Sequence, residues 1–361
     1  MNNLKKKNIC VTGGLGFIGS CLIRKLLNYE NLKIFNIDFD GYASSEDSLI
    51  NLLSKNEENP SNYKYINIDI SDMGKLKKVF NDINPDIIFH LAAESHVDRS
   101  IDNPFPFINS NILGTFNLLE LSRFFYSNLS LKRKKEFKFI HISTDEVFGS
   151  LDEEGLFSEK SRYDPRSPYS ASKASSDHLV KAWFHTYGLP TIICNCSNNY
   201  GPWQFPEKFI PNIILKALNN LPIPIYGNGE NIRDWLFVED HVNALIKISS
   251  KGVPGSSYCI GGNNEKTNIQ LARYICDYLD KVKPNSIKYS KLIKFVKDRP
   301  GHDKRYAIDS SKIKESLNWE ESFSFENGIK HTINWYIANL NWCEKILAKS
   351  KYRGERLGLK S

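Results

Sequence analysis

The stretch Cys10-Val-Thr-Gly-Gly-Leu-Gly-Phe-Ile-Gly19 decides the fold, because it sets three evenly spaced glycines between a β-rich run and a helical one. The run Asn8–Thr12 is typical of a buried strand, and Phe17–Asn28 has the apolar spacing of a helix. The glycines permit a tight turn, let the backbone approach a pyrophosphate and let the helix pack closely on the strand. The helix N-terminus offers oriented N–H groups to phosphates. The stretch therefore predicts a dinucleotide-binding turn; an ordinary strand-to-helix turn is the alternative.

An acidic residue supports this interpretation and indicates which dinucleotide binds. Asp38 follows a second predicted strand, Lys33–Ile37, and stands about 20 residues after the glycines. A carboxylate at that point can accept hydrogen bonds from a ribose diol, and it repels a 2′-phosphate. We therefore expect NAD rather than NADP.

Further β-rich runs alternate with amphipathic stretches through the first half of the chain. Strands that alternate with helices favour right-handed crossovers and a parallel sheet. The predicted fold class is therefore α/β, a Rossmann-type doubly wound parallel sheet. Its remaining strands are predicted at Lys64–Ile68, Ile87–Ala92, Lys138–Ser143 and Thr191–Asn195, and its further helices at Met73–Asn81 and Asn109–Tyr126.

The texture of the sequence changes after residue 198, where prolines interrupt shorter elements. We predict an NAD-binding domain over residues 1–198 and a smaller C-terminal α/β substrate-binding lobe over residues 199–232 and 251–361. Residues 233–250 are expected to return to the first domain, with a strand at Trp235–Val238 and a helix at Asp240–Ser249.

Composition excludes several classes of protein. The 361 residues carry a formal net charge of +7 and are 41% hydrophobic, which is typical of a globular chain. No apolar run approaches the roughly 20 residues of a membrane span, and the N-terminus passes into the first strand pattern rather than a signal peptide. The basic cluster Lys132–Lys135 lacks the support of a nucleic-acid motif, so a solvated loop or helix end is expected there. The seven cysteines have no metal-ligand spacing, which favours reduced buried thiols, no metal and a cytoplasmic location.

Two polar constellations are expected at the carboxyl edge of the sheet. Tyr169 and Lys173 lie four residues apart at a helical opening, so an ammonium on the same helix face would lower the pKa of the phenol. Thr144, Asp145 and Glu146 follow the fifth strand, where a hydroxyl and two carboxyls can serve acid–base steps if their pKa values are held apart. The alternatives are a chance spacing and a solvated acidic turn. Downstream of a dinucleotide motif, the two constellations predict proton transfers beside a nicotinamide.

The chain resembles the extended short-chain dehydrogenase/reductase superfamily, and within it the nucleotide-sugar 4,6-dehydratases of the dTDP-glucose 4,6-dehydratase type. The resemblance runs from about Lys7 to about Trp335. It rests on the motifs Thr12–Gly19, Ala92–Ser100, Ser143–Gly149, Ser167–His178, Ser197–Pro202, Arg233–His241 and Asp298–Asp303.

The resemblance implies a three-step dehydration of a nucleotide-linked glucose, with NAD returned unchanged. Tyr169, supported by Lys173 and Thr144, would deprotonate the C4 hydroxyl. Glu146 would take the C5 proton while Asp145 protonates the departing C6 hydroxyl, giving a 4-keto-6-deoxy sugar. A homodimer is also implied, through helices near Asn109–Tyr126 and Tyr169–Tyr187.

Two sets of binding residues follow from the same resemblance and from the strand ends. The NAD-binding set is Gly13, Gly16, Phe17, Ile18, Gly19, Asp38, Asp69, Ile70, Leu91, Ala92, Ala93, Ser95, Ser110, Tyr169, Lys173 and Asn199. The substrate-binding set is Ser95, Thr144, Asn198, Glu207, Lys208, Pro224, Tyr226, Arg233, Asn268, Arg299 and His302. An ion pair between Arg233 and Asp234 and a plain polar turn at Asp298–Asp303 are the alternatives for the second set. Loop packing is favoured over catalysis for His96, Asp98 and Arg99.

The sequence departs from the family pattern at a few positions. Phe148 stands where tyrosine is common, Ser110 stands where threonine is usual, and the run Asp38–Ser45 differs after its first residue. None of these positions bears on the nucleotide base. The alternatives that stay open are a UDP- or other NDP-hexose 4,6-dehydratase, a nucleotide-sugar 4-epimerase and a catalytically silent NAD-binding regulator.

Overall fold

The computed structural model describes residues 6–53, 62–350, 352, 354 and 357–358. Its centre is a seven-stranded sheet in the order β10-β6-β5-β4-β1-β2-β3, with parallel pairing throughout. The order reverses between β1 and β4, as in the predicted Rossmann-type sheet. The strands are β1 (Asn8–Thr12), β2 (Lys33–Asp38), β3 (Tyr63–Asn67), β4 (Ile87–His90), β5 (Lys138–Thr144), β6 (Thr191–Cys196) and β10 (Ser257–Ile260).

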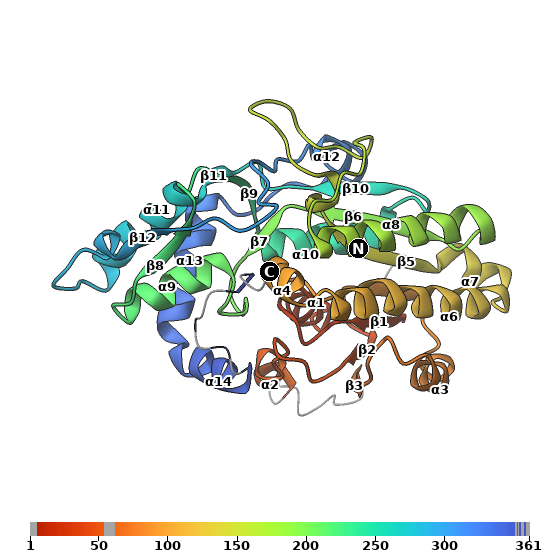
Figure 1. Ribbon diagram of the computed structural model, residues 1–361. Helices are drawn as coiled ribbons and strands as arrows, with labels where there is room; N and C mark the ends of the chain where they lie inside the picture. Colours follow the sequence, from red (N-terminus) through yellow and green to blue (C-terminus); the bar gives the residue numbers. More distant parts are fainter. Residues whose placement is uncertain (1–5, 54–61, 351, 353, 355–356, 359–361) are drawn as a thin grey trace.

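Helices cover both faces of this sheet (Figure 1). On one face α1 (Phe17–Leu26) packs against α10 (Val238–Lys251), and on the other lie α3 (Met73–Ile83), α6 (Thr115–Ser127) and α8 (Pro168–Tyr187). The strands serve both cores because successive side chains point to opposite faces. In β4, Ile87 and Phe89 pack in the α1 core, and Ile88 packs in the α6 core.

The helix predicted over Asn109–Tyr126 is interrupted. A π-helix, η3 (Ile108–Gly114), runs directly into α6. At the junction a Cβ on Gly114 would lie 2.6 Å from the Ile70 side chain, so this turn rests closely on the end of the third strand. The shorter helices of the same region are α2 (Asp47–Leu53), α4 (Val97–Asp102), α5 (Phe105–Phe107) and α7 (Leu131–Glu136). The basic cluster lies on α7, where Arg133 forms an ion pair of 2.8 Å with Asp86.

A second core occupies the left of Figure 1. It combines a three-stranded sheet, a strand pair and four helices. These are β11-β9-β7, with β7 (Asn198–Tyr200), β9 (Ile232–Phe237) and β11 (Glu265–Thr267); β12-β8, with β8 (Ile223–Tyr226) and β12 (Ile293–Val296); and α9 (Phe209–Leu218), α11 (Asn268–Val282), α13 (Phe325–Ala338) and α14 (Leu340–Ser350).

The segment boundaries differ from the prediction in two places. After residue 251 the chain contributes β10, which pairs with β6 in the large sheet, and α12 (Ser311–Leu317), which packs against β10 and α10. The strand predicted at Trp235–Val238 is β9, and it pairs with β7 and β11 in the small sheet. A strand as short as β10 carries too little pattern to reveal a partner distant in the sequence. Within residues 233–250, the helix α10 does return to the first core, where it packs on α1.

All seven cysteines are free and buried, as the sequence predicted. Within the described ranges no helix has both the length and the apolar character needed to cross a membrane.

Candidate active site

A cavity of about 320 Å³ opens along the carboxyl edge of the large sheet. It lies where ligands bind in doubly wound folds, beyond the strand ends at the switch point. Every residue of the predicted NAD-binding set lines this cavity. Those residues come from the glycine turn and the start of α1, from the ends of β2, β3 and β4, and from η3, α8 and β7.

The glycine turn fits a dinucleotide because there is no room for side chains. Gly13 has a φ of +74°, and a Cβ there would lie 2.6 Å from the backbone N of Ala92. A Cβ on Gly19 would lie 2.1 Å from the carbonyl oxygen of Gly13. Gly16 stands before α1 with no side chain over the helix N-terminus. The N–H groups of the turn itself bond within the protein, as those of Gly13 and Gly14 do to Ile37 and Asn36. The start of α1, which no side chain caps, is therefore the part that offers N–H groups to phosphate oxygens.

Asp38 lines the same cavity at the end of β2, where the sequence predicts the adenosine ribose. Its Oδ2 accepts a hydrogen bond of 2.8 Å from the N–H of Leu15, and its Oδ1 accepts one from the N–H of Phe39. Burial raises the pKa of this carboxyl to about 6, although both backbone hydrogen bonds act in the other direction. The carboxylate is thus fixed toward the turn and retains lone pairs for a ribose diol.

The catalytic candidates meet at the opposite end. Thr144 ends β5, and Asp145 and Glu146 begin the 3₁₀ turn η4 (Asp145–Phe148). Tyr169 and Lys173 lie in the first turns of α8, where Ser167 and Ser170 form a capping box. All five side chains line the 320 Å³ cavity.

The predicted lowering of the Tyr169 pKa is wrong for the protein alone. Burial raises the pKa of this phenol well above 10, the charge of Glu146 raises it further, and a hydrogen bond with Thr144 lowers it. The Lys173 ammonium donates a hydrogen bond of 2.8 Å to the carbonyl oxygen of Ile142. Burial lowers the pKa of Lys173 to about 8. Desolvation of the tyrosinate thus outweighs a neighbouring cation that is committed to the β5 backbone.

The two carboxyls are held in different surroundings. Asp145 is fully buried; its Oδ1 accepts from the Thr144 hydroxyl at 3.1 Å and its Oδ2 has no partner. Burial and the charge of Glu146 raise the pKa of Asp145 well above its usual range. Burial also raises the pKa of Glu146, but three cations act against it, namely Arg299, Arg233 and Lys208.

A second cavity of about 250 Å³ adjoins the first on the side of the smaller core. All the predicted substrate-binding residues line it except Thr144, which lines the first cavity. The two cavities share seven lining residues, so they are continuous past Glu146. These are Ser95, Glu146, Asn198, Asn199, Gln204, Glu207 and Lys208.

Two arginines line the second cavity, and each is fixed. Arg233 donates to the carbonyl oxygens of Ile232 and Asp303 and lies over the ring of Tyr306 at 4.2 Å. Its neighbour Asp234 accepts from the N–H groups of Gly262 and Asn264, so the ion-pair alternative does not describe this pair.

Arg299 donates to Asp98 at 2.7 Å, and its buried Nε has no partner. Asp98 also accepts from the Tyr226 hydroxyl at 2.8 Å. His302 lies 2.6 Å from Asp298 and beside the Tyr226 ring, so the turn over residues 298–303 belongs to the cavity wall. The carboxylate of Asp98 on α4 therefore orients two residues of the predicted substrate set.

Comparison with known proteins identifies the family. A family model described as GDP-mannose 4,6 dehydratase matches residues 10–332. A dTDP-glucose 4,6-dehydratase of Escherichia coli is 52% identical, and the match covers 97% of this chain and 99% of that one. The chain belongs to the dTDP-glucose 4,6-dehydratase family. Two solved dTDP-glucose 4,6-dehydratases with NAD bound have similar structures. The enzyme of Bacillus anthracis is 40% identical with a TM-score of 0.80, and that of Streptomyces venezuelae is 36% identical with a TM-score of 0.83. Each covers 94% of this chain and 99% of its own.

The positions where this member of the dTDP-glucose 4,6-dehydratase family departs from the pattern have plain structural settings. Phe148 is buried against Phe157 and Tyr163, with ring centroids 5.4 Å apart in both pairs. Ser110 lines the NAD-side cavity. In the changed run after Asp38, Ser45 accepts a hydrogen bond from Trp342 of α14. The loop at the adenosine end is thus held by the C-terminal helix.

Sequence reasoning missed the contact that Arg99 and Tyr42 make with Glu207. Arg99 donates to Glu207 at 2.8 Å and lies over the ring of Tyr42, whose hydroxyl donates to Glu207 at 3.0 Å. The predicted substrate ligand Glu207 therefore has its carboxylate engaged within the protein. The polar run after β4 was the available signal for Arg99, and nothing in the sequence marked Tyr42.

Other lining residues also went unpredicted. Phe39, Gly41, Ala43 and Phe205 line the NAD-side cavity, and Tyr306, Tyr352, Gly354 and Leu357 line the second one. The C-terminal residues reach that cavity from beyond the last helix, which no local pattern could reveal.

Proposed function

We propose that this protein converts dTDP-glucose to dTDP-4-keto-6-deoxyglucose by oxidation at C4, loss of water across C5 and C6, and reduction at C6. One observation carries the proposal: an NAD-type cavity and a cation-lined cavity meet at Glu146, beside Asp145, Thr144 and Tyr169. A sugar at that junction would present its C4–C6 edge to acid–base groups and its diphosphate to the cations.

The chemistry supplied by bound NAD is reversible storage of a hydride. The residues of this chain supply the proton transfers. Tyr169, hydrogen-bonded to Thr144, is the proposed base for the C4 hydroxyl, with Lys173 one helical turn behind it. The C4 ketone acidifies the C5 proton, because the resulting carbanion is delocalised as an enolate.

Water loss then needs one acid and one base, and the two carboxyls suit these roles. Burial raises the pKa of Asp145 well above its usual range, which favours the protonated form, so this carboxyl suits the donation of a proton to the departing C6 hydroxyl. Burial also raises the pKa of Glu146, but three cations act against that rise and favour the ionised form, so this carboxyl suits the acceptance of the C5 proton. A 4-epimerase requires no such pair, and a silent regulator requires none of these side chains.

The second cavity supports the binding of a nucleoside diphosphate. Positive charge lines its wall at Arg233, Arg299 and Lys208. The buried Oδ1 of Asn198 accepts no hydrogen bond within the protein and can accept one from a bound sugar. Pro224, Tyr226 and Asn268 line the same cavity. On this basis the large sheet with its helices would hold NAD, and the smaller core would hold the nucleotide sugar.

The purified protein should convert dTDP-glucose to a 4-keto-6-deoxy product. Parallel incubations with dTDP-, UDP- and CDP-glucose, each followed by mass spectrometry of the product, test the activity and the base preference together. No product from any of the three would refute the proposal. Equal rates with dTDP- and UDP-glucose would remove only the preference for thymine and favour a broader NDP-hexose dehydratase.

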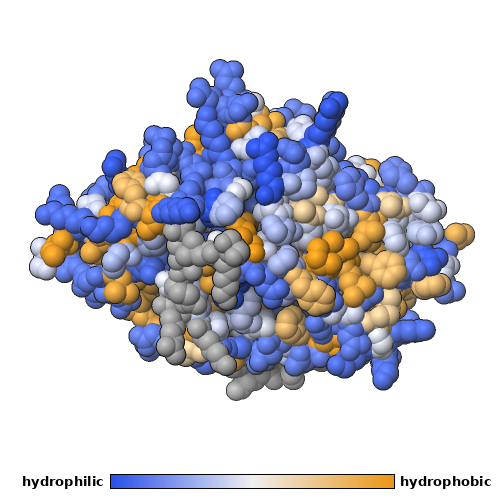
Figure 2. Space-filling view, in the orientation of Figure 1, coloured by the Kyte–Doolittle hydropathy of each residue, from blue (hydrophilic) through white to orange (hydrophobic). Residues whose placement is uncertain are grey.

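We also propose that the protein is a homodimer that works in the cytoplasm. Apolar side chains gather on the right of the face in Figure 2, over the region of η3 and α6. Phe116 packs on Trp183 of α8, and Phe124 is 57% exposed. Such a patch, rimmed by charged groups, is typical of an interface between subunits. Seven free cysteines suit a reducing compartment.

A further inference from the structure

A buried carboxylate that the proposed reaction does not use lies one helical turn beyond Lys173. Asp177 follows Lys173 by four residues on α8, and its side chain has no exposed surface. It lines neither cavity. A carboxylate taken out of water is costly unless other groups compensate its charge.

Four side chains from three segments converge on this carboxylate. Oδ2 accepts hydrogen bonds from Ser143 (2.9 Å), Tyr163 (3.1 Å) and Asn195 (3.2 Å), and the Nε2 of His141 lies 3.2 Å from Oδ1. These contacts outweigh the cost of burial, and the Asp177 pKa is lowered. Asp177 is therefore ionised in the middle of the protein.

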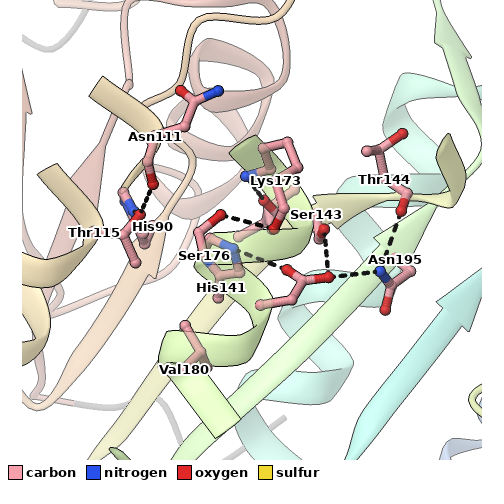
Figure 3. Close-up of polar contacts among 12 residues, drawn as sticks. His90, Asn111, Thr115, His141, Ser143, Thr144, Lys173, Ser176, Val180 and Asn195 are labelled. Atoms are coloured by element: carbon pink, nitrogen blue, oxygen red, sulfur yellow. Dashed lines mark hydrogen bonds and ion pairs between the residues drawn. The ribbon is translucent and has the colours of Figure 1, made fainter. Parts of the chain in front are cut away.

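The same contacts reach the residues proposed for catalysis. Ile142, whose carbonyl oxygen accepts from Lys173, stands between His141 and Ser143 in β5. Lys173 thus bonds to one residue of β5, and Asp177 contacts the residues on either side of it. Asn195 adds a hydrogen bond of 3.2 Å to the carbonyl oxygen of Thr144. Figure 3 shows these contacts meeting beneath Lys173, with Thr144 at the end of the strand.

The histidines, the phenol and the thiols around this pair carry no charge at neutral pH, while the part-buried Lys181 ammonium donates to the Tyr163 hydroxyl at 3.3 Å. Burial lowers the pKa of His141 to about 4 and that of His90 well below 6.5. Burial also raises the pKa values of the Tyr163 phenol and of the Cys194 and Cys196 thiols above their usual range. Among the buried groups here, Lys173 and Asp177 are thus the two charged side chains. The uncharged groups are His90 on β4, His141 on β5, Tyr163 before α8, and Cys194 and Cys196 on β6.

We propose that Asp177 is a positioning residue whose buried charge, one helical turn away, keeps the Lys173 ammonium charged against β5. The inference rests on the proposed function in that Lys173 serves Tyr169. Without the Asp177 charge, Lys173 would be a buried cation with no opposing charge, and it would release its proton at lower pH. The two charges thereby hold Lys173 and the end of β5 in one geometry.

Asp177→Asn tests this directly, because it keeps the shape and removes the charge. We expect the alkaline limb of the kcat–pH profile to move to a pH about one unit lower. At pH values above that limb, kcat should therefore fall by about tenfold relative to the wild-type protein. The KM for dTDP-glucose should not change, since Asp177 lines neither cavity. Ser176→Ala is the matched control: this buried hydroxyl bonds only to carbonyls of its own helix, and its loss should leave the limb in place.

A thermal-unfolding cycle provides a readout that needs neither NAD nor substrate. Asp177→Asn should lower Tm more in the wild-type background than in the Lys173→Met background, where no buried cation remains. If the single variant fails to fold, the Lys173→Met/Asp177→Asn double variant should fold again. An unshifted limb, equal losses of Tm in both backgrounds, or a double variant that also fails to fold would each overturn the proposal. Activity of the wild-type protein on dTDP-glucose tests the function separately.

Discussion

Asp145 and Glu146 are neighbours in the chain, yet they meet different surroundings at the sugar site. Glu146→Gln should allow oxidation at C4 but block the loss of water, because an amide cannot accept the C5 proton. We expect product formation to fall by about 10²–10⁴-fold. In rapid mixing, the absorbance of reduced nicotinamide should rise and persist.

The exposed carboxylate of Glu153 provides the control for this change. Its side chain is 88% exposed on the loop after β5, and Glu153→Gln should leave the rate as it is. Dehydration by Glu146→Gln at the wild-type rate would remove Glu146 from the role of base.

Asp38 is expected to make NAD binding depend on pH. Its pKa in the folded protein is raised to about 6, so the carboxylate loses its charge as pH falls through that value. A charged acceptor forms the stronger hydrogen bond to a ribose hydroxyl, so the Kd for NAD should rise several-fold between pH 7 and pH 5. Titration calorimetry at a series of pH values measures this directly.

Asp38→Asn should abolish the trend and also reduce the discrimination against NADP, since the repelling charge is gone. Asp47→Asn should retain the pH dependence of the Kd. Asp47 begins α2 and forms an ion pair with Lys345 of α14. A Kd for NAD that does not vary with pH in the wild-type protein would contradict this role.

The turn between β1 and α1 shows how strictly an element can depend on one glycine. Gly13→Ala combines a left-handed φ with a Cβ 2.6 Å from the Ala92 backbone, so a loss of roughly 2–5 kcal/mol of stability is expected. The change should also weaken NAD binding, since the backbone of the turn must shift. Denaturant unfolding and NAD titration measure the two effects.

Gly188→Ala separates backbone strain from crowding. Gly188 ends α8 with a φ of +66°, but nothing lies within 4 Å of a Cβ built there. The cost should therefore be near 1 kcal/mol, with NAD binding unchanged. Equal losses in the two variants would show that the close approach to Ala92 is not what the turn requires.

Local pattern predicts the first six strands of the large sheet because each is a compact apolar run before a turn. It fails where the deciding contact is distant: β10 is defined by β6, and the π-helix before α6 rests on Ile70. At the site the same limit applies. The glycines, Asp38 and the carboxyls of residues 145 and 146 follow from spacing, whereas the rise in the Tyr169 pKa depends on how completely the fold buries it.

At the scale of the whole molecule, the apolar patch over η3, α6 and α8 is expected to join two subunits. Phe124→Asp places a charge in that patch and should convert dimers to monomers in sedimentation or light scattering. Phe295→Asp is the control, because this side chain is equally exposed (57%) on β12 in the other core. A mass that does not change in Phe124→Asp would place the interface elsewhere.

Because β10 closes the large sheet at its β6 edge, that sheet is finished late in synthesis. About 260 residues must leave the ribosome before its last strand can pair, and the polypeptide between β6 and β10 includes strands and a helix of the second core. Neither core therefore arises from one uninterrupted stretch, and no single cut yields an independent half. Nascent chains that end before residue 257 would expose the β6 edge to other strands, so this protein should depend on chaperones most just before that point.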